Sequence, residues 1–86
     1  MNMKKITIYS KEICPYCVKA KNLLKRKGVN FNEIIVNSDE IKQNMIKKSN
    51  GRITVPQIFI GDYHVGGCDD LHALESEGKL DKLLNE

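Results

Sequence analysis

Cys14-Pro15-Tyr16-Cys17 is the stretch that decides the fold, because of what lies on either side of it. Residues 4–9 before it (KKITIY) alternate β-branched and other side chains, a pattern that predicts a β-strand. Residues 18–27 after it are rich in Lys, Ala and Leu and predict a helix that ends at Gly28. The two cysteines are therefore predicted to lie where a strand passes into a helix, with Pro15 at the first helical position.

This position gives the two cysteines different chemical roles. Backbone N–H groups in the first turn of a helix have no intrahelical partner, and the macrodipole adds partial positive charge there. Both favour a thiolate at Cys14, since such positions lower a cysteine pKa from about 8.5 to roughly 3.5–7.5. Cys17 follows three residues later on the same helical face, close enough to attack a sulfur bonded to Cys14. The pattern is typical of thiol–disulfide exchange, with a structural disulfide or half of a zinc site as the alternative.

The size and composition of the chain predict one globular domain, residues 1–86. With 41% hydrophobic and 29% charged residues, it matches folded domains and not disordered chains. Residues 1–5 include two lysines, but no apolar run of signal-peptide length follows them, and no stretch approaches the roughly 18 apolar residues of a membrane span. Three cysteines, an odd number, fit a reducing cytoplasm better than a secreted disulfide framework. We therefore expect a cytoplasmic protein without a membrane partner.

The net charge of +3 comes largely from Lys and Arg side chains along two predicted helices, between residues 19 and 27 and between residues 42 and 48. Charges along amphipathic helices are usually solvated faces, and no base-stacking aromatic residues accompany them. Nucleic-acid binding is therefore not expected, and the charge is better suited to attract small anionic substrates. A monomer is the default expectation.

The next part of the sequence completes a βαβ unit and adds a helix. The apolar end of residues 29–36 indicates a second buried strand, parallel to the first through a right-handed crossover. The following helix is predicted to begin with Asn37 as its N-cap, and Glu40 would complete a capping box. Asn50-Gly51 is predicted to end this helix.

The second half begins with residues 54–60, a strand in which Pro56 must lie at a start or an edge because it cannot donate to a sheet ladder. Gly61-Asp62 predicts a two-residue hairpin to the next strand. Asp69 is predicted to cap a last helix that ends at Gly78, with a short helical turn after it. The predicted order is βαβαββα, an α/β fold with one four-stranded mixed sheet flanked by helices.

Three motifs in this order resemble those of the dithiol glutaredoxins, most closely the short bacterial glutaredoxin-3 type, over nearly the whole chain. They are Tyr9-Ser10-Lys11 with Cys14-Pro15-Tyr16-Cys17, then Thr54-Val55-Pro56-Gln57, then Gly66-Gly67-Cys68-Asp69-Asp70-Leu71. The resemblance implies a thioredoxin-like fold, and glutathione as co-substrate with no permanently bound cofactor or metal. It also implies reduction of protein–glutathione mixed disulfides by Cys14 alone, and of protein disulfides by Cys14 with Cys17. Ribonucleotide reductase is one protein partner that it implies.

The same resemblance implies that glutathione is bound by Lys11, Tyr16, Thr54, Val55, Pro56, Gly67, Cys68 and Asp69. In this arrangement Lys11, helped by Gln57, would hold the glycyl carboxylate. Tyr16 would pack beside the bound sulfur. The backbone of Val55 would pair with the cysteinyl residue as an added strand does, which implies a cis Val55–Pro56 bond.

The other end of glutathione would meet Gly67-Cys68-Asp69, whose free N–H groups would donate to the γ-glutamyl carboxylate while the Asp69 side chain pairs with the ammonium. Asp70 is assigned mainly to helix capping. One departure from the family pattern is Ile53, which stands where members often carry a basic residue. Arg52 lies one position earlier, and no direct binding role is expected for it. His64 is predicted to face solvent, without a catalytic role.

Two alternatives use the same cysteines as ligands. Cys14 and Cys17, together with Cys68 and His72, have the spacings of the two halves of a tetrahedral zinc site. Cys14 and glutathione could instead ligate an iron–sulfur cluster shared by two monomers, although relatives specialised for clusters usually carry one cysteine and a glycine-rich motif. A thioredoxin proper is a third reading, against which Lys11 and the anion site at Cys68-Asp69 argue. His72 receives no catalytic role.

Overall fold

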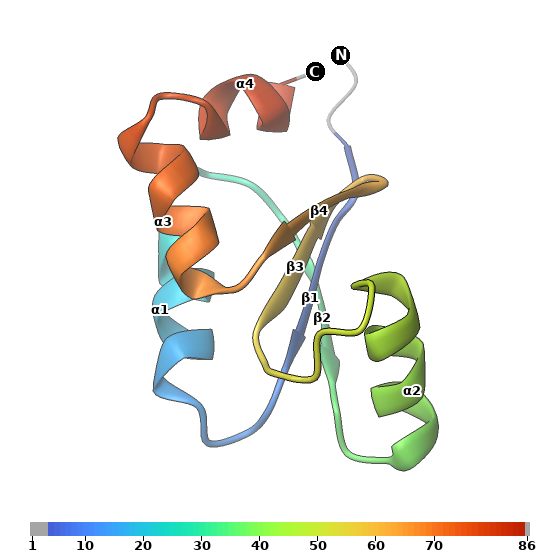
Figure 1. Cartoon of the computed structure of the whole chain (residues 1–86). Helices are drawn as coiled ribbons and strands as arrows, with labels where there is room; N and C mark the ends of the chain where they lie inside the picture. The colour runs from blue at the N-terminus through green and yellow to red at the C-terminus, as the bar shows by residue number, and fades with distance from the viewer. Residues whose placement is uncertain (1–3, 86) are drawn as a thin grey trace.

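The chain folds into a four-stranded sheet with helices on both faces, as the computed structural model shows for residues 4–85 (Figure 1). The elements in chain order are β1 (Ile6–Ser10), α1 (Pro15–Arg26), β2 (Asn32–Ile35), α2 (Asp39–Lys48), β3 (Gln57–Ile60), β4 (Tyr63–Gly66), α3 (Cys68–Ser76) and α4 (Leu80–Asn85). The predicted order is confirmed, and the predicted terminal turn is helix α4. Residues 1–3 and 86, at the two ends of the predicted domain, lie outside the described residues.

The strand order in the sheet is β2-β1-β3-β4. β1 and β2 are parallel, with Ile8 beside Glu33, as the βαβ unit requires. β3 is antiparallel to both β1 and β4, and Gly61-Asp62 joins β3 to β4 as the predicted hairpin. Tyr9 pairs with Gln57. This pairing brings the segment before β3 to the end of the sheet at which β1 leads into the two cysteines.

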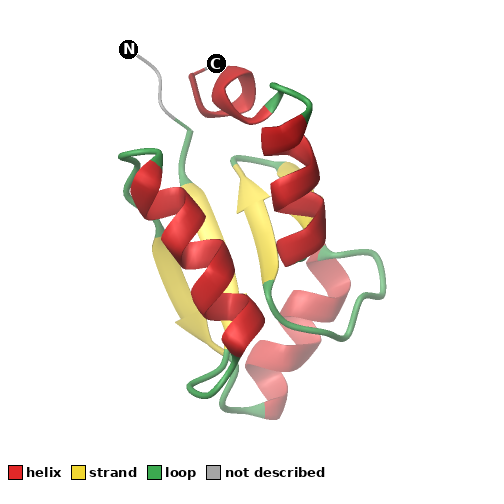
Figure 2. Cartoon of the chain, turned by 90° about the vertical axis from the view of Figure 1, so that its left-hand side faces the viewer, coloured by secondary structure: helices red, strands yellow, loops and turns green. Residues whose placement is uncertain are grey.

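The two faces of the sheet are covered by different helices. α1 and α3 lie on one face and α2 on the other, and Figure 2 looks onto α1 and α3 with α2 behind the sheet. Because strand side chains alternate, Ile6 and Ile8 belong to the core under α1 and α3, whereas Tyr9 belongs to the core under α2. The core between the sheet and helices α1 and α3 includes Ile6, Ile8, Leu23, Leu24, Ile58, Ile60 and Leu71. The core between the sheet and α2 contains Tyr9, Met45 and Phe59.

The start of helix α2 differs from the prediction. Ser38, not Asn37, is the N-cap, because its backbone is extended and its Oγ accepts a hydrogen bond of 3.3 Å from the N–H of Ile41. The N–H of Asn37 instead donates to the carbonyl of Ile35, so Asn37 belongs to the turn that leaves β2. Glu40 lies within the first turn and does not form the predicted box.

The start of helix α3 also moves by two residues. Gly67 is the N-cap and Asp69 is the second helical residue, so the prediction that Asp69 caps the helix is wrong. The cap contact comes from Asp70, whose carboxylate accepts a hydrogen bond of 2.8 Å from the N–H of Gly67. The capping role assigned to Asp70 is therefore confirmed, and Asp69 is left with its side chain exposed.

Across the part of the chain that the structure describes, none of the helices has the length and apolar character needed to cross a bilayer.

Candidate functional site

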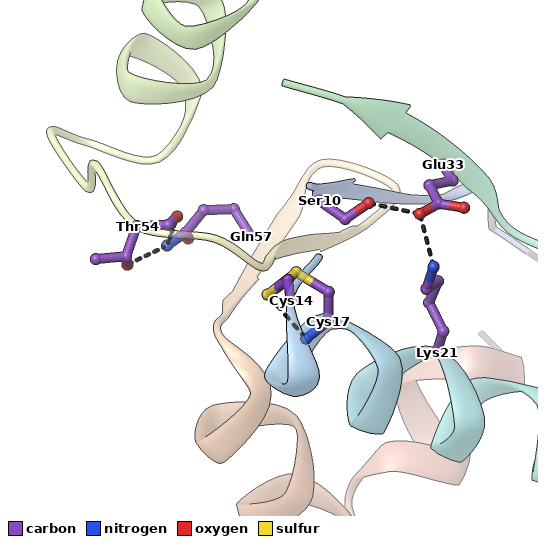
Figure 3. Close-up of a disulfide and its surroundings, with 7 residues drawn as sticks. All are labelled: Ser10, Cys14, Cys17, Lys21, Glu33, Thr54 and Gln57. Atoms are coloured by element: carbon purple, nitrogen blue, oxygen red, sulfur yellow. Dashed lines mark hydrogen bonds and ion pairs between the residues drawn. A yellow bond between two sulfur atoms is a disulfide. The ribbon is translucent and has the colours of Figure 1, made fainter. Parts of the chain in front are cut away.

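The two cysteines occupy the junction between the loop after β1 and helix α1, as predicted. Cys14 is the N-cap of α1 and Pro15 is its first residue. Cys14 and Cys17 are joined as a disulfide, with their Cα atoms 5.2 Å apart (Figure 3). Cys17 is fully buried, whereas Cys14 is only partly buried. An incoming sulfur therefore reaches Cys14 before Cys17.

The surroundings of Cys14 favour negative charge on its sulfur. The N–H of Cys17 donates to Cys14 Sγ over 3.2 Å, the contact that an oxygen makes in an ordinary N-cap. The first turn, Pro15-Tyr16-Cys17, carries no acidic side chain that would oppose a thiolate. The positive end of the helix macrodipole acts in the same direction. Cys14 is thus placed to react as a thiolate once the disulfide is reduced.

A polar network lies beside the dithiol, between the end of β1, β2 and α1 (Figure 3). Ser10, at the end of β1, donates its hydroxyl to the carboxylate of Glu33 over 2.5 Å. Lys21, one turn after Cys17 in α1, pairs with the same carboxylate over 2.7 Å. The Lys21 ammonium and then the Ser10 hydroxyl lower the pKa of the Glu33 carboxyl, against the opposing effect of burial. Glu33 therefore joins β2 and α1 as an ion at neutral pH.

A cavity of about 360 Å³ opens beside the dithiol. Three segments that are far apart in the sequence line it. Their lining residues are Tyr16, Arg52, Thr54, Val55, Pro56, Gly67, Cys68, Asp69 and Asp70. Seven of the eight residues predicted to bind glutathione are in this set, and Lys11 is the exception. Lys11 is exposed in the loop between β1 and α1, outside the cavity lining.

We call residues 52–56 the first wall and residues 67–70 the second wall of this cavity. The Val55–Pro56 peptide bond in the first wall is cis, as expected. The walls approach each other closely, because a Cβ on Gly67 would lie 3.5 Å from the carbonyl oxygen of Pro56. At the surface, Arg52 Nη2 and Asp70 Oδ2 are 3.5 Å apart. The cavity thus has a cation and two carboxylates, those of Asp69 and Asp70, on its rim.

Sequence reasoning did not anticipate that Arg52 would line the cavity. The position just before Thr54, which is often basic in the family that the motifs resemble, is Ile53, and its side chain is 65% exposed and outside the cavity lining. The pairing of Arg52 with Asp70 joins residues 18 apart. Spacing along the chain carries no signal for such a contact; only the two walls folding together produces it.

Two polar side chains behind the cavity also differ from expectation. Gln57 is fully buried, and its amide contacts Thr54 and His64, so the prediction that it helps Lys11 is wrong. His64 does not simply face solvent, since it is partly buried and its ring stacks on that of Phe59 at a centroid distance of 4.8 Å. Burial lowers the pKa of His64, and Arg52 adds to this while Asp70 opposes it.

The third cysteine lies in the second wall beside a histidine. Cys68 is 6% exposed, and its Sγ is 3.5 Å from Nδ1 of His72, which also lies 2.9 Å from the Cys68 carbonyl oxygen. Burial raises the pKa of the Cys68 thiol, the Asp69 carboxylate raises it further, and Lys19 opposes both. Cys68 is therefore the less reactive type of thiol at neutral pH.

The zinc alternative finds no support in this arrangement. Within residues 4–85, no three His, Cys, Asp or Glu side chains are grouped so that they could hold a metal ion. Cys14 and Cys17 are bonded to each other, and Cys68 contacts His72 instead of joining them.

These features define a class: an α/β protein with a thioredoxin-like sheet, in which a partly exposed and a buried cysteine begin a helix beside a charged cavity. A family model, Glutaredoxin, matches residues 6–65. Glutaredoxin 3 of Escherichia coli (strain K12) is 52% identical over 82 residues, which cover 95% of this chain and 99% of that protein. The chain belongs to the glutaredoxin family, as its motifs suggested, and the family makes it a thiol–disulfide oxidoreductase.

Solved structures agree with the fold. The solution structure of glutaredoxin from Brucella melitensis has a TM-score of 0.85 and 55% identity, and covers 98% of this chain and 91% of its own. The crystal structure of a buckwheat glutaredoxin–glutathione complex has a TM-score of 0.87 and 31% identity, and covers 95% of this chain and 77% of its own. Both confirm the thioredoxin-like architecture predicted from the motifs.

Proposed function

We propose that this protein reduces protein–glutathione mixed disulfides, with glutathione as the reductant and Cys14 as the nucleophile. The observation that carries the proposal is the cavity beside Cys14, because its two walls offer charges of both signs. Glutathione is an extended tripeptide with two carboxylates and one ammonium, so its site must offer both signs. A related buckwheat glutaredoxin has been crystallised as a glutathione complex, which supports the same ligand for this chain.

The second wall would bind the γ-glutamyl end. The N–H groups of Cys68 and Asp69 lie in the first turn of α3, where intrahelical acceptors are missing, so they can bind a carboxylate. The Asp69 carboxylate is exposed on the cavity rim and can pair with the ammonium. These two contacts would fix the orientation of the tripeptide.

The first wall would bind the middle of the tripeptide. The backbone of Val55 would pair with the cysteinyl residue as an added strand, between Thr54 and Pro56, and Tyr16 would pack beside the sulfur. The glycyl carboxylate would then extend toward Lys11, the predicted cation. Arg52 is a second cation on the wall itself, although Asp70 already partly neutralises it.

The reaction on a mixed disulfide needs only Cys14. Its thiolate attacks the glutathione sulfur, a new Cys14–glutathione disulfide forms, and the bond to the substrate protein breaks. The substrate thiolate leaves and takes a proton from solvent. A second glutathione, as thiolate, attacks the glutathione sulfur of the adduct, which releases oxidised glutathione and restores the Cys14 thiolate.

Protein disulfides need both cysteines. Cys14 attacks one sulfur of the substrate and releases the other as a thiol, and Cys17 then attacks Cys14, releasing the reduced substrate and forming the Cys14–Cys17 disulfide. Two molecules of glutathione reduce this disulfide, through a Cys14–glutathione adduct, to two thiols and oxidised glutathione. Ribonucleotide reductase is a substrate that the family resemblance implies.

We further propose that the protein is a cytoplasmic monomer formed by one domain, residues 1–86.

The test is glutathione-dependent reduction of a glutathionylated peptide by the wild type, Cys14→Ser and Cys17→Ser. We expect activity to be lost only in Cys14→Ser, because Cys17 takes no part in the mixed-disulfide route. Reduction of a protein disulfide should be lost in both variants. If all three proteins are inactive on the peptide, or if Cys14→Ser retains activity, the proposed function is wrong.

A further inference from the structure

A buried amide lies directly behind the cavity. Gln57, the first residue of β3, is 0% exposed. Its Nε2 lies 3.0 Å from the carbonyl oxygen of Thr54 and 3.3 Å from the Thr54 hydroxyl. Figure 3 draws both contacts as dashed lines. Its Oε1 lies 2.7 Å from Nε2 of His64, on the neighbouring strand β4. The side chain thus has partners at both ends, one in the first wall and one on β4.

The chemistry of these partners fixes the protonation of His64. The carbonyl of Thr54 can only accept, so the end of the Gln57 amide that faces it must be the NH₂ group. The other end is then the oxygen, which can only accept, and Nε2 of His64 must carry the hydrogen. Burial lowers the pKa of His64, which favours the neutral ring, and in the neutral ring the hydrogen-bond partners place the proton on Nε2. Stacking on Phe59 holds the ring in this orientation.

This chain of hydrogen bonds connects the two walls from behind. Thr54 belongs to the first wall. His64 lies on β4, two residues before the strand ends at Gly66. From Gly66 the chain passes directly into the second wall at Gly67. On the solvent side, the ion pair between Arg52 and Asp70 spans the same gap, but it is exposed and 3.5 Å long. Exposed pairs of this kind hold structure weakly, so the buried connection is the stronger constraint.

We propose that Gln57 and His64 are positioning residues that hold the first wall in the shape that binds glutathione; this rests on the proposed function. Neither residue lines the cavity, so both act through Thr54. Without the His64 donor, the buried oxygen of Gln57 has lost its partner, and the side chain shifts toward water or another donor that can satisfy this oxygen. Its NH₂ group then leaves the Thr54 carbonyl, and the backbone at Val55 loses its alignment with the substrate.

The experiment compares His64→Leu, which fills similar space without a donor, with His64→Gln, whose side-chain NH₂ can replace Nε2–H. The assay is steady-state reduction of a glutathionylated peptide, together with the rate at which iodoacetamide alkylates reduced Cys14. We expect His64→Leu to raise KM roughly tenfold, the effect of one lost buried hydrogen bond, with the alkylation rate unchanged. His64→Gln should recover most of the wild-type KM. Leu83→Ala in α4 controls for a general loss of stability.

The alternative outcomes separate the two proposals. A wild-type protein that does not reduce the peptide overturns the proposed function and this inference with it. A normal KM in folded His64→Leu, or a raised KM that His64→Gln does not recover, overturns the inference alone. If His64→Leu does not fold, Gln57→Glu replaces it, because a carboxylate can accept from His64 but cannot donate to the Thr54 carbonyl; its KM must rise. Nitrogen NMR shifts of His64 that place the proton on Nδ1 also refute the inference.

Discussion

The junction between β4 and α3 should be the position least tolerant of a single added methyl group. Gly66 has a φ angle of +112°, a backbone conformation that residues with a side chain rarely adopt. A Cβ at this position would meet the carboxylate of Asp70, lying 2.9 Å from its Cγ. That carboxylate cannot simply move away, because it accepts from the N–H of Gly67 and pairs with Arg52. Gly66→Ala therefore combines backbone strain with loss of the helix cap.

The magnitude follows from these two effects. Strain at such a backbone position costs about 1–3 kcal/mol, and a lost N-terminal cap contact costs about 0.5–2 kcal/mol. We expect Gly66→Ala to lower the free energy of unfolding by about 1.5–5 kcal/mol, which for a domain of this size lowers Tm by roughly 6–40 °C. Because the displaced Asp70 belongs to the second wall, KM for a glutathionylated peptide should rise as well.

The assay is urea denaturation of Gly66→Ala beside a matched control, Gly78→Ala. Gly78 also has a positive φ, +73°, but a Cβ there meets nothing within 4 Å. The control should therefore lose only about 1–2 kcal/mol and keep its KM. In an Asp70→Ala background the collision is absent, so adding Gly66→Ala should cost only its backbone strain. Equal losses in Gly66→Ala and Gly78→Ala, with KM unchanged in both, would refute the reasoning.

Three further predictions concern charge and reactivity. Lys21 and Ser10 lower the pKa of Glu33 in the folded protein. The contribution of Glu33 to stability is therefore present above its unfolded pKa of about 4.3 and is lost as the pH falls through the lower, folded pKa. On acidification from pH 5 to pH 2 the wild type should lose more stability than Glu33→Gln, and parallel curves of stability against pH would contradict this. Lys11→Ala should raise KM for the glutathionylated peptide by roughly 3–10-fold, and the increase should be larger at low salt. If only Arg52→Ala raises KM, Arg52 is the cation that holds the glycyl carboxylate. Burial raises the pKa of Cys68, so iodoacetamide at pH 7 should label reduced Cys14 well before Cys68, and mass spectrometry of digests detects the order; labelling of Cys68 first would show that its burial does not protect it.

The sequence was informative wherever function depends on neighbours along the chain. The strand, Pro15 and the helix after it determine where Cys14 and Cys17 lie, and Gly61-Asp62 determines the hairpin, because turn and cap chemistry act over a few residues. Cap positions were less predictable. Several polar residues in a row can each cap a helix, and the backbone decides between Asn37 and Ser38.

Contacts between distant segments could not be read from the sequence. Arg52 meets Asp70, and Gln57 meets His64, only because β3 and β4 pair and bring the two walls together. The expectation for His64 failed for the same reason: a strand residue next to a hairpin turn is exposed by default, but here Phe59 on the paired strand supplies a surface for its ring. The motif resemblance predicted most of the residues that line the cavity, but the contacts that hold these residues in place depend on tertiary packing.

The construction of the cavity from three distant segments has a consequence for the newly made protein. The strand, the dithiol and the first helix leave the ribosome first, while the two walls follow 35 to 53 residues after Cys17. At about 5–20 residues per second, the last wall residue is synthesised roughly 3–10 s after the cysteines. During that interval the nascent chain has both thiols but lacks the cavity that would select their reaction partners. Chemical reactivity is thus acquired early in biosynthesis, and selectivity only at its end.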